Sequence, residues 1–266
     1  MNRNTYRKTW LRLHRSYQNK ITTIFMREVR KIVKGIPIDN LTENTYEAII
    51  RLNMPKDSFE QVYMDAYLQV GLLHGKRVGA GINKELKRFE IDVFANEYRR
   101  FLAQWLIDNA GTRIVLVRGS LVDYLIQSVA EGFASGNDLP TITRDLHRLM
   151  RSRGFYRWQA ARIARTEATA AANYGASIAG QTSGIVLEKE WISSNDPRTR
   201  RRPDNKYDHI EVDGQKVAEK GLFNVQGDLI KFPGDPKGNP SNIINCRCAM
   251  SLVPKRDRDG RLVRKQ

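Results

Sequence analysis

The spacing of apolar residues changes near Gly184, and this change limits the folds open to the chain. Before Gly184, apolar residues recur every three to five positions, which is typical of amphipathic helices. After it, short runs of alternating side chains are separated by turn pairs such as Asp213-Gly214 and Gly227-Asp228. The sequence therefore predicts a mainly α N-terminal region followed by a small α+β C-terminal domain with short antiparallel strands.

Glycine and proline positions divide the chain into four parts. We place a basic amphipathic helix or arm at residues 1–34, a helical domain at 35–184, a small α+β domain at 185–254 and a basic flexible tail at 255–266. Helices are predicted at 41–52, from 55 to a loop or hinge near Gly79–Gly81, at 84–110 ended by Gly111, and at 114–134, 139–151 and 155–182. The alanine-rich centre of the last helix favours close approach of a neighbouring helix. Strands are predicted at 186–191, 229–232 and 249–253.

The net charge of +16 at pH 7 indicates what kind of partner the chain binds, and says little about its fold. A polyanion such as nucleic acid would balance it, and the alternative is a basic surface that is merely solvated. The basic helix at 1–34 either lies on DNA or an acidic partner, or packs its apolar stripe on the domain. No apolar run is long enough to span a membrane, and we expect no membrane contact. Two cysteines make no disulfide framework and fit synthesis in a reducing cytosol.

Several short motifs follow one another in the last third of the chain. They are Asp196-Pro197-Arg198-Thr199-Arg200, His209 followed by Asp213-Gly214-Gln215, Phe232-Pro233-Gly234-Asp235-Pro236, and Asn245-Cys246-Arg247-Cys248. In this order they resemble the C-terminal domain of the phage head morphogenesis family, the minor capsid proteins of the phage Mu F type. Arg165-Thr166-Glu167, followed by alanines, is similar to the segment that precedes this domain in the family, which extends the resemblance to residues 138–254.

The resemblance implies a non-enzymatic minor capsid or head morphogenesis protein of a tailed phage. Such a protein is made in the host cytoplasm and lies in the virion, in the capsid interior near the portal. The implied partners are the phage portal protein, the major capsid or scaffold protein, and double-stranded DNA bound without sequence preference. Two other classes stay open: a nuclease-like DNA-processing enzyme centred on His209 and the arginine loop, and a cytosolic basic DNA-binding module.

Basic residues of the loop after Asp196 and of the tail are the candidates for contact with DNA phosphates. They are Arg198, Arg200, Arg201, Arg202, Lys255 and Arg256. The alternative for the loop is a mobile charged segment. In the helix before it, Arg162, Arg165 and Glu167 are expected to form an ion-paired seam with the following domain.

His209, Cys246 and Cys248 form the best candidate for a chemical site. Residues two apart in a strand point to one face, so both sulfurs could converge with the imidazole on a zinc ion, with Asp196 or Asp208 as a fourth ligand. Members of the resembled family carry a Cys-x-x-Cys pair before the Asp-Gly, whereas this chain has His209 in place of the second cysteine and none in place of the first. We therefore expect no metal and no cofactor, with zinc as the alternative.

The same residues also have a structural interpretation. His209 would hold the loop at 198–215 against the strand at 245–248. Arg247 would be a partly buried cation neutralised by Asp196 or Asp213.

Overall fold

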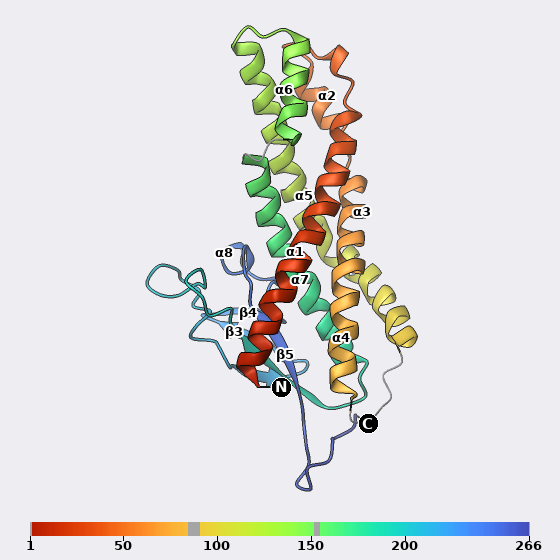
Figure 1. Ribbon diagram of the computed structural model, residues 1–266, viewed down its shortest axis with the longest axis vertical. Helices are drawn as coiled ribbons and strands as arrows, with labels where there is room; N and C mark the ends of the chain where they lie inside the picture. Colours follow the sequence, from red (N-terminus) through yellow and green to blue (C-terminus); the bar gives the residue numbers. More distant parts are fainter. Residues whose placement is uncertain (1, 85–90, 152–154, 266) are drawn as a thin grey trace.

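The computed structural model describes residues 2–84, 91–151 and 155–265. Long helices run along the length of the molecule, and the strands lie beside one end of this bundle, next to the start of α1 (Figure 1). The helical elements are α1 (Arg3–Lys34), a 3₁₀ turn (Ile38–Asn40), α2 (Tyr46–Leu52), α3 (Lys56–Ala66), a π-helical segment (Tyr67–Gly71), α4 (Leu72–Ile82), α5 (Ile91–Ala134), α6 (Leu139–Arg151) and α7 (Phe155–Gln181). The predicted fold class is confirmed. None of the described helices has an apolar stretch long enough to cross a bilayer.

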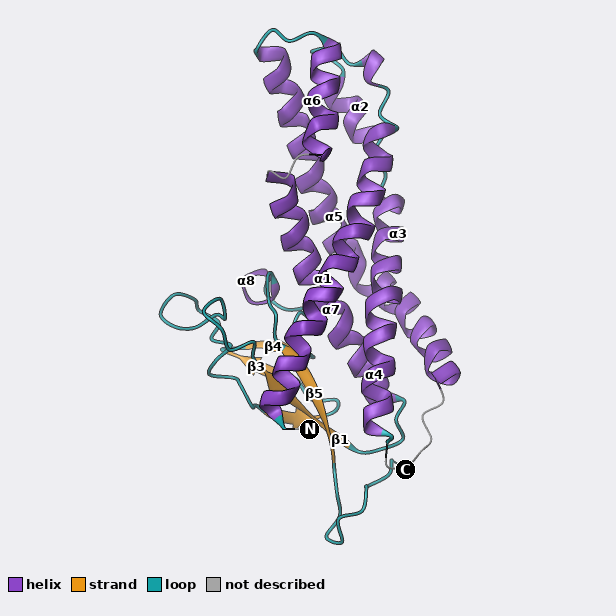
Figure 2. Cartoon of the chain, viewed as in Figure 1, coloured by secondary structure: helices purple, strands orange, loops and turns teal. Residues whose placement is uncertain are grey.

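A three-stranded antiparallel sheet forms the centre of the C-terminal region (Figure 2). Strand β1 (Leu187–Ile192) lies between β2 (Lys216–Ala218) and β5 (Ala249–Pro254), with Trp191 opposite Met250. A separate hairpin joins β3 (Phe223–Val225) to β4 (Asp228–Ile230), and the short helix α8 (Pro240–Ile243) precedes the cysteines. The sequence pattern predicted β1, β4 and β5 to within two residues. It missed β2 and β3, because three residues are too few to establish an alternating pattern.

Helix α1 is part of the core rather than a separate arm. Its apolar stripe is buried against α7, α3 and the π-helical segment: Trp10, Tyr17, Ile21, Ile24, Phe25, Val29 and Val33. One continuous cluster of buried apolar side chains runs from Trp10 to Met250 and so includes the C-terminal region. Of the two interpretations of residues 1–34, the structure supports packing on the domain, because burial of this stripe stabilises a helix that has little stability alone.

Glycines of α4, of the segment before it and of α7 allow two helices to cross closely. A Cβ on Gly175 of α7 would lie 1.9 Å from the carbonyl oxygen of Gly71, and one on Gly75 would lie 2.7 Å from that of Gly175. Helix α4 continues through Gly79–Gly81 to Ile82, so the predicted loop is wrong. The alanine-rich centre of α7 packs closely against α4 and α1, as predicted. Within the π-helical segment, the carbonyl of Tyr67 accepts a hydrogen bond from the hydroxyl of Tyr98, at 2.9 Å.

Helix α5 is continuous across Gly111, where the sequence suggested a break. A glycine inside a helix costs only about 1 kcal/mol relative to alanine. Buried side chains before and after it, among them Leu102 and Leu125, anchor both halves of α5 in the same core and offset that cost. The start predicted at residue 84 for this helix lies partly outside the described residues.

The basic tail, expected to be flexible, folds back on the sheet. Backbone hydrogen bonds join Lys255 to Val186, Val186 to Val263 and Lys265 to Gly184, at 2.8–2.9 Å. The Lys265 ammonium also pairs with Glu219 at 2.8 Å. The composition of the segment concealed this pairing, because a charged surface hairpin and a disordered basic tail look alike in sequence.

Candidate functional site

Helix α7 presents a row of polar side chains to the segment that leads into β5. The Thr166 hydroxyl accepts a hydrogen bond from the Asn245 N–H at 2.9 Å, and Thr169 donates to the carbonyl of Cys246 at 2.5 Å. One turn on, Asn173 donates to the carbonyls of Cys248 and Pro233 and accepts from the Met250 N–H. Positions three and four apart lie on one helix face, so the row follows the extended backbone.

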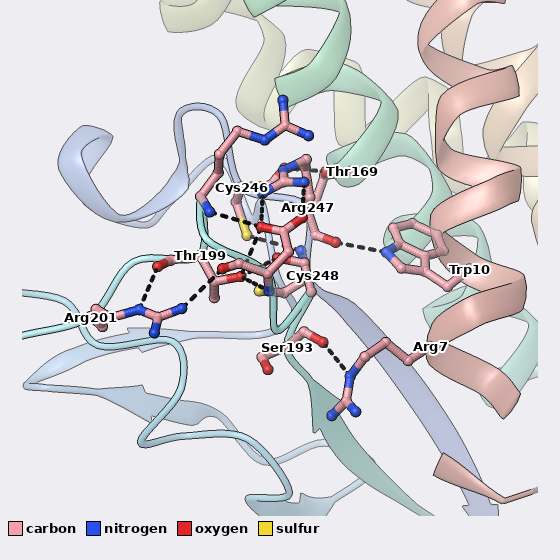
Figure 3. A network of polar contacts seen from close by, with 12 residues as sticks. Arg7, Trp10, Thr169, Ser193, Thr199, Arg201, Cys246, Arg247 and Cys248 are labelled. Carbon is pink, nitrogen blue, oxygen red and sulfur yellow. Dashed lines mark hydrogen bonds and ion pairs between the residues drawn. The ribbon is translucent and has the colours of Figure 1, made fainter. Parts of the chain in front are cut away.

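Helix α1 supplies a second row to the same backbone. The Tyr6 hydroxyl donates to the carbonyl of Met250 at 3.0 Å, and Trp10 Nε1 donates to that of Arg247 at 2.7 Å (Figure 3). His14 Nε2 lies 2.9 Å from Thr169 Oγ1. Because that hydroxyl donates to a carbonyl, the imidazole must be the donor to it. We call the contacts of both rows with residues 245–250 the strand-edge junction.

The junction provides hydrogen-bond partners for the edge strand of the sheet. Strand β5 lies at an edge, and the outward N–H and C=O groups of an edge strand need partners when they are buried. At Trp191 both backbone groups of β1 bond residues on the β2 side, so the facing groups of Met250 point outward. Side chains of two helices take the place of a further strand there.

The side chain of Arg247 forms a bidentate ion pair with Asp196. Its Nη2 lies 2.6 Å from Asp196 Oδ1, and its Nη1 pairs with Oδ2. Asp196 also accepts from the Arg198 N–H at 3.0 Å, and the Thr199 hydroxyl accepts from the Asp196 N–H at 2.9 Å. Burial raises the pKa of Asp196, but hydrogen bonds and charge from Arg247 outweigh it and lower the pKa. The predicted neutralisation of Arg247 by Asp196 is confirmed.

Asp213, the other carboxylate predicted to neutralise Arg247, pairs with different arginines. It pairs with Arg3 at 2.9 Å and Arg7 at 2.8 Å, and it accepts from the Ser193 N–H, so it anchors the start of α1 to the sheet. Gly214 follows with φ of +87°, a conformation that favours glycine. The Gln215 amide then exchanges two hydrogen bonds with the backbone of Asn224 in β3.

His209 meets both cysteines in a buried cluster that we call the Cys-His-Cys cluster. Its Nδ1 lies 3.4 Å from Cys248 Sγ and 3.7 Å from Cys246 Sγ, and all three donor atoms lie within 4.8 Å of one another. The other ring nitrogen, Nε2, lies 2.7 Å from Asn242 Oδ1. His209 also bonds through its backbone N–H to the carbonyl of Arg200 at 3.0 Å. His209 therefore joins the loop to the cysteines as expected, but the cysteines precede β5 and are not themselves in a strand.

The two thiols of the cluster titrate differently. Burial raises the pKa of both. At Cys246, hydrogen bonds with Cys248 and His209 and the charge of His209 outweigh burial, and the pKa lies well below the ordinary thiol value. At Cys248, burial and the neighbouring sulfur act together and raise the pKa well above that value. The cluster thus favours one thiolate beside one thiol.

Comparison with known proteins provides one relative. The chain is 22% identical over 249 residues to the uncharacterized protein YqbB of Bacillus subtilis (strain 168), which covers 89% of this chain and 77% of YqbB. No family model matches the chain, and no solved structure matches it.

Arg165 joins α7 to the C-terminal region through a hydrogen bond. Arg165 Nη1 donates to Asn245 Oδ1 at 2.7 Å. Glu167 contacts the helical region, where the hydroxyls of Tyr63 and Tyr67 lie 3.4 Å from its oxygens. The proposed zinc ligands Asp196 and Asp208 serve other partners, Arg247 and the backbone N–H groups of 202, 210 and 211.

The arginines predicted to bind DNA divide into two groups. Arg200 and Arg201 bond backbone carbonyls of Ile244, Thr199 and Asp196, which makes the loop ordered rather than mobile. The side chains of Arg198 and Arg202 are exposed and make no hydrogen bond or ion pair with any residue that the structure describes. In the tail, Arg256 bonds the carbonyl of Gly260 at 2.7 Å, and Lys255 is exposed.

Sequence reasoning missed the helix residues of the strand-edge junction. They are Tyr6, Trp10, His14, Thr169 and Asn173. A signal was present: buried Thr169 and Asn173 stand four apart within an alanine-rich face, where polar side chains need partners. Their partners, however, are backbone groups, which no side-chain pattern can identify.

Proposed function

We propose that this chain is a minor capsid, or head morphogenesis, protein of a tailed phage, which acts without catalysis in the capsid interior near the portal. The observation that supports this best is that the motif residues bind one another and the neighbouring elements. Asp196, Arg247 and Asn245, with Thr166 from the preceding helix, form a framework of polar contacts that joins α1, α7 and the segment before β5. Motif residues that stabilise the fold in this way suit a structural domain that docks on other head proteins.

DNA contact in this proposal is assigned to the exposed face of α1 and to the arginine loop. Arg12, Arg15, Lys20 and Arg27 line a shallow groove of about 600 Å³ along α1. A row of cations along one helix suits contact with phosphates, which carries no sequence information. Exposed Arg198 and Arg202 extend the basic surface on the C-terminal region.

The nuclease alternative gains no support from the geometry of His209. Only 1% of this residue is exposed, and its ring nitrogens face Asn242 and the two sulfurs. A general base must lie within hydrogen-bond distance of the group whose proton it takes, and an attacking water beside a phosphodiester cannot reach an imidazole that is almost fully buried. We therefore retain the structural proposal alone.

Salt-dependent DNA binding tests the basic groove. Binding of a double-stranded fragment is measured over a range of salt for the intact protein and for the triple variant Arg12→Glu, Arg15→Glu, Lys20→Glu. If each residue neutralises one phosphate, the slope of log K against log salt falls in magnitude by about 2.7, at about 0.9 per phosphate. The control is the triple Lys216→Glu, Lys220→Glu, Lys237→Glu, which makes the same charge change on exposed residues of the C-terminal region. Equal effects of both triples would remove the groove from the proposal.

Head association is tested by co-expression with the portal, scaffold and major capsid proteins of the same phage. We expect the chain to purify with the portal, and antibodies to detect it in mature particles but not outside the capsid shell. Its absence from particles, together with no portal complex, would overturn the proposal. Plasmid nicking that disappears with His209→Ala would revive the nuclease.

A further inference from the structure

We propose that the Cys-His-Cys cluster binds a zinc ion through His209 Nδ1 and the sulfurs of Cys246 and Cys248. The inference is independent of the proposed function, because it concerns only how these three side chains are placed. Both sulfurs lie next to the same ring nitrogen of His209, while the side chain of Arg247 between them pairs with Asp196.

The separations fit the edges of a zinc tetrahedron. With Zn–N of about 2.0–2.1 Å and Zn–S of about 2.3 Å, tetrahedral angles place a nitrogen and a sulfur ligand about 3.6 Å apart. The two separations from Nδ1, 3.4 Å and 3.7 Å, lie on either side of that value. The two nitrogen–sulfur separations therefore fit a common zinc ion, and the two sulfurs lie at most 4.8 Å apart.

A hydrogen-bonded chain fixes the orientation of the imidazole. The carboxylate of Asp228 accepts from Asn242 Nδ2 at 2.6 Å, so the amide must present its oxygen, Oδ1, to His209. That oxygen can only accept, so Nε2 carries a proton and Nδ1 is the nitrogen that faces the sulfurs. Metal-binding histidines commonly donate their second N–H to an oxygen in this manner.

Charge and hydrogen bonding also suit two thiolates on a divalent ion. The cluster is buried, and two thiolates with Zn²⁺ are together neutral, which avoids burying a net charge. The Cys248 N–H already points to Cys246 Sγ at 3.4 Å, a contact that stabilises sulfur carrying negative charge. Among the residues that the structure describes, no other His, Cys, Asp or Glu joins these three donors. We assign the fourth position to water.

Metal titration of the full chain tests the site. Protein purified under reducing conditions is stripped with a chelator and titrated with Zn²⁺, and separately with Co²⁺. We expect one ion per chain, thiolate charge-transfer bands and intense d–d absorption from cobalt, and a melting temperature that rises with zinc and falls again with chelator. Cys246→Ser and Cys248→Ser should each remove one thiolate from the cobalt spectrum and abolish zinc binding at micromolar concentrations.

Two further variants separate metal binding from general loss of stability. Asn242→Ala, which frees the imidazole from its oxygen partner, should weaken zinc binding about 10- to 100-fold. His74→Gln changes another buried histidine, outside the cluster, and should leave the stoichiometry and the cobalt spectrum unchanged. Failure of the intact chain to bind zinc at micromolar concentrations would overturn the proposal. So would selective binding of Cu⁺, zinc affinity of the serine variants equal to that of the intact chain, or an intact mass showing a Cys246–Cys248 disulfide in freshly prepared protein.

Discussion

Replacing Asn173 with alanine should destabilise the protein more than any other single truncation on the polar face of α7. The side chain is fully buried and makes three hydrogen bonds, to Pro233 O at 2.9 Å, Cys248 O at 3.2 Å and Met250 N at 2.8 Å. All three partners are backbone groups, and two of them lie along the outward edge of the sheet. Asn173→Ala removes their partner and leaves them in place.

The expected cost follows from the number of groups left unpaired. Each buried polar group without a partner costs about 1–3 kcal/mol, so three groups give at least about 3 kcal/mol. For a chain of this size, 1 kcal/mol corresponds to a shift of about 2–4 °C, so the melting temperature should fall by about 6–12 °C. Asn173→Asp should be no better, because it sets a carboxylate against two carbonyl oxygens.

Thermal unfolding followed by circular dichroism, with urea unfolding at 25 °C, measures the loss. Asn96→Ala on α5 is the control for helix propensity, because Asn96 is an exposed helix residue. Hydrogen exchange at the Met250 amide supplies a local readout and should accelerate in Asn173→Ala alone. The account of the strand edge would be refuted if the melting temperatures of Asn173→Ala and the Asn96→Ala control differed by less than about 2 °C. That difference is smaller than the shift expected from one unpaired group.

Three other perturbations have defined outcomes. Gly175→Ala places a methyl group against a backbone oxygen and should cost at least about 1–3 kcal/mol in urea unfolding, whereas Gly81→Ala, with nothing within 4 Å, should stabilise α4 by about 0.5–1 kcal/mol. Asp196→Asn leaves Arg247 without its carboxylate and should cost about 3 kcal/mol, and adding Arg247→Met should recover part of the melting temperature. Burial lowers the pKa of His74 to about 3, so the unfolded chain binds one more proton between about pH 6.5 and pH 3. His74 alone should therefore lower stability by about 1.4 kcal/mol per pH unit as the solution is acidified through that window, in addition to the contribution of His14, whose pKa burial lowers to about 4, and His74→Gln should remove its own share of the slope.

The overall architecture could be predicted because helix periods and turn residues are local signals. Gly184 marks the change of region in the sequence and in the structure, with α7 ending at Gln181 and β1 beginning at Leu187. The errors arose where packing outweighs a local signal. Gly111 does not end α5, because buried side chains anchor the helix on both sides of it. Gly175 allows a close helix crossing, and its partner there, Gly71, is distant in the sequence.

The candidate site could be predicted only where side chains meet side chains. The pairing of Asp196 with Arg247 and the convergence of His209 with the cysteines both followed from residue chemistry at suggestive spacing. The contacts of Trp10 and Thr169 could not be predicted in this way, because carbonyl groups occur at every position and leave no trace in the sequence. The same holds for the hairpin formed by the basic tail, which depends on backbone pairing.

The strand-edge junction closes the chain into a loop that spans most of its length. Tyr6 and Met250, which share a hydrogen bond, stand 244 residues apart. Closing so long a loop is entropically costly and makes the junction a late event in folding. Until residues 245–250 have been synthesised, Tyr6 and Trp10 of α1 lack their partners, the backbone carbonyls of Met250 and Arg247. A partner that binds before that point would therefore meet a different surface on a nascent chain than on a finished one.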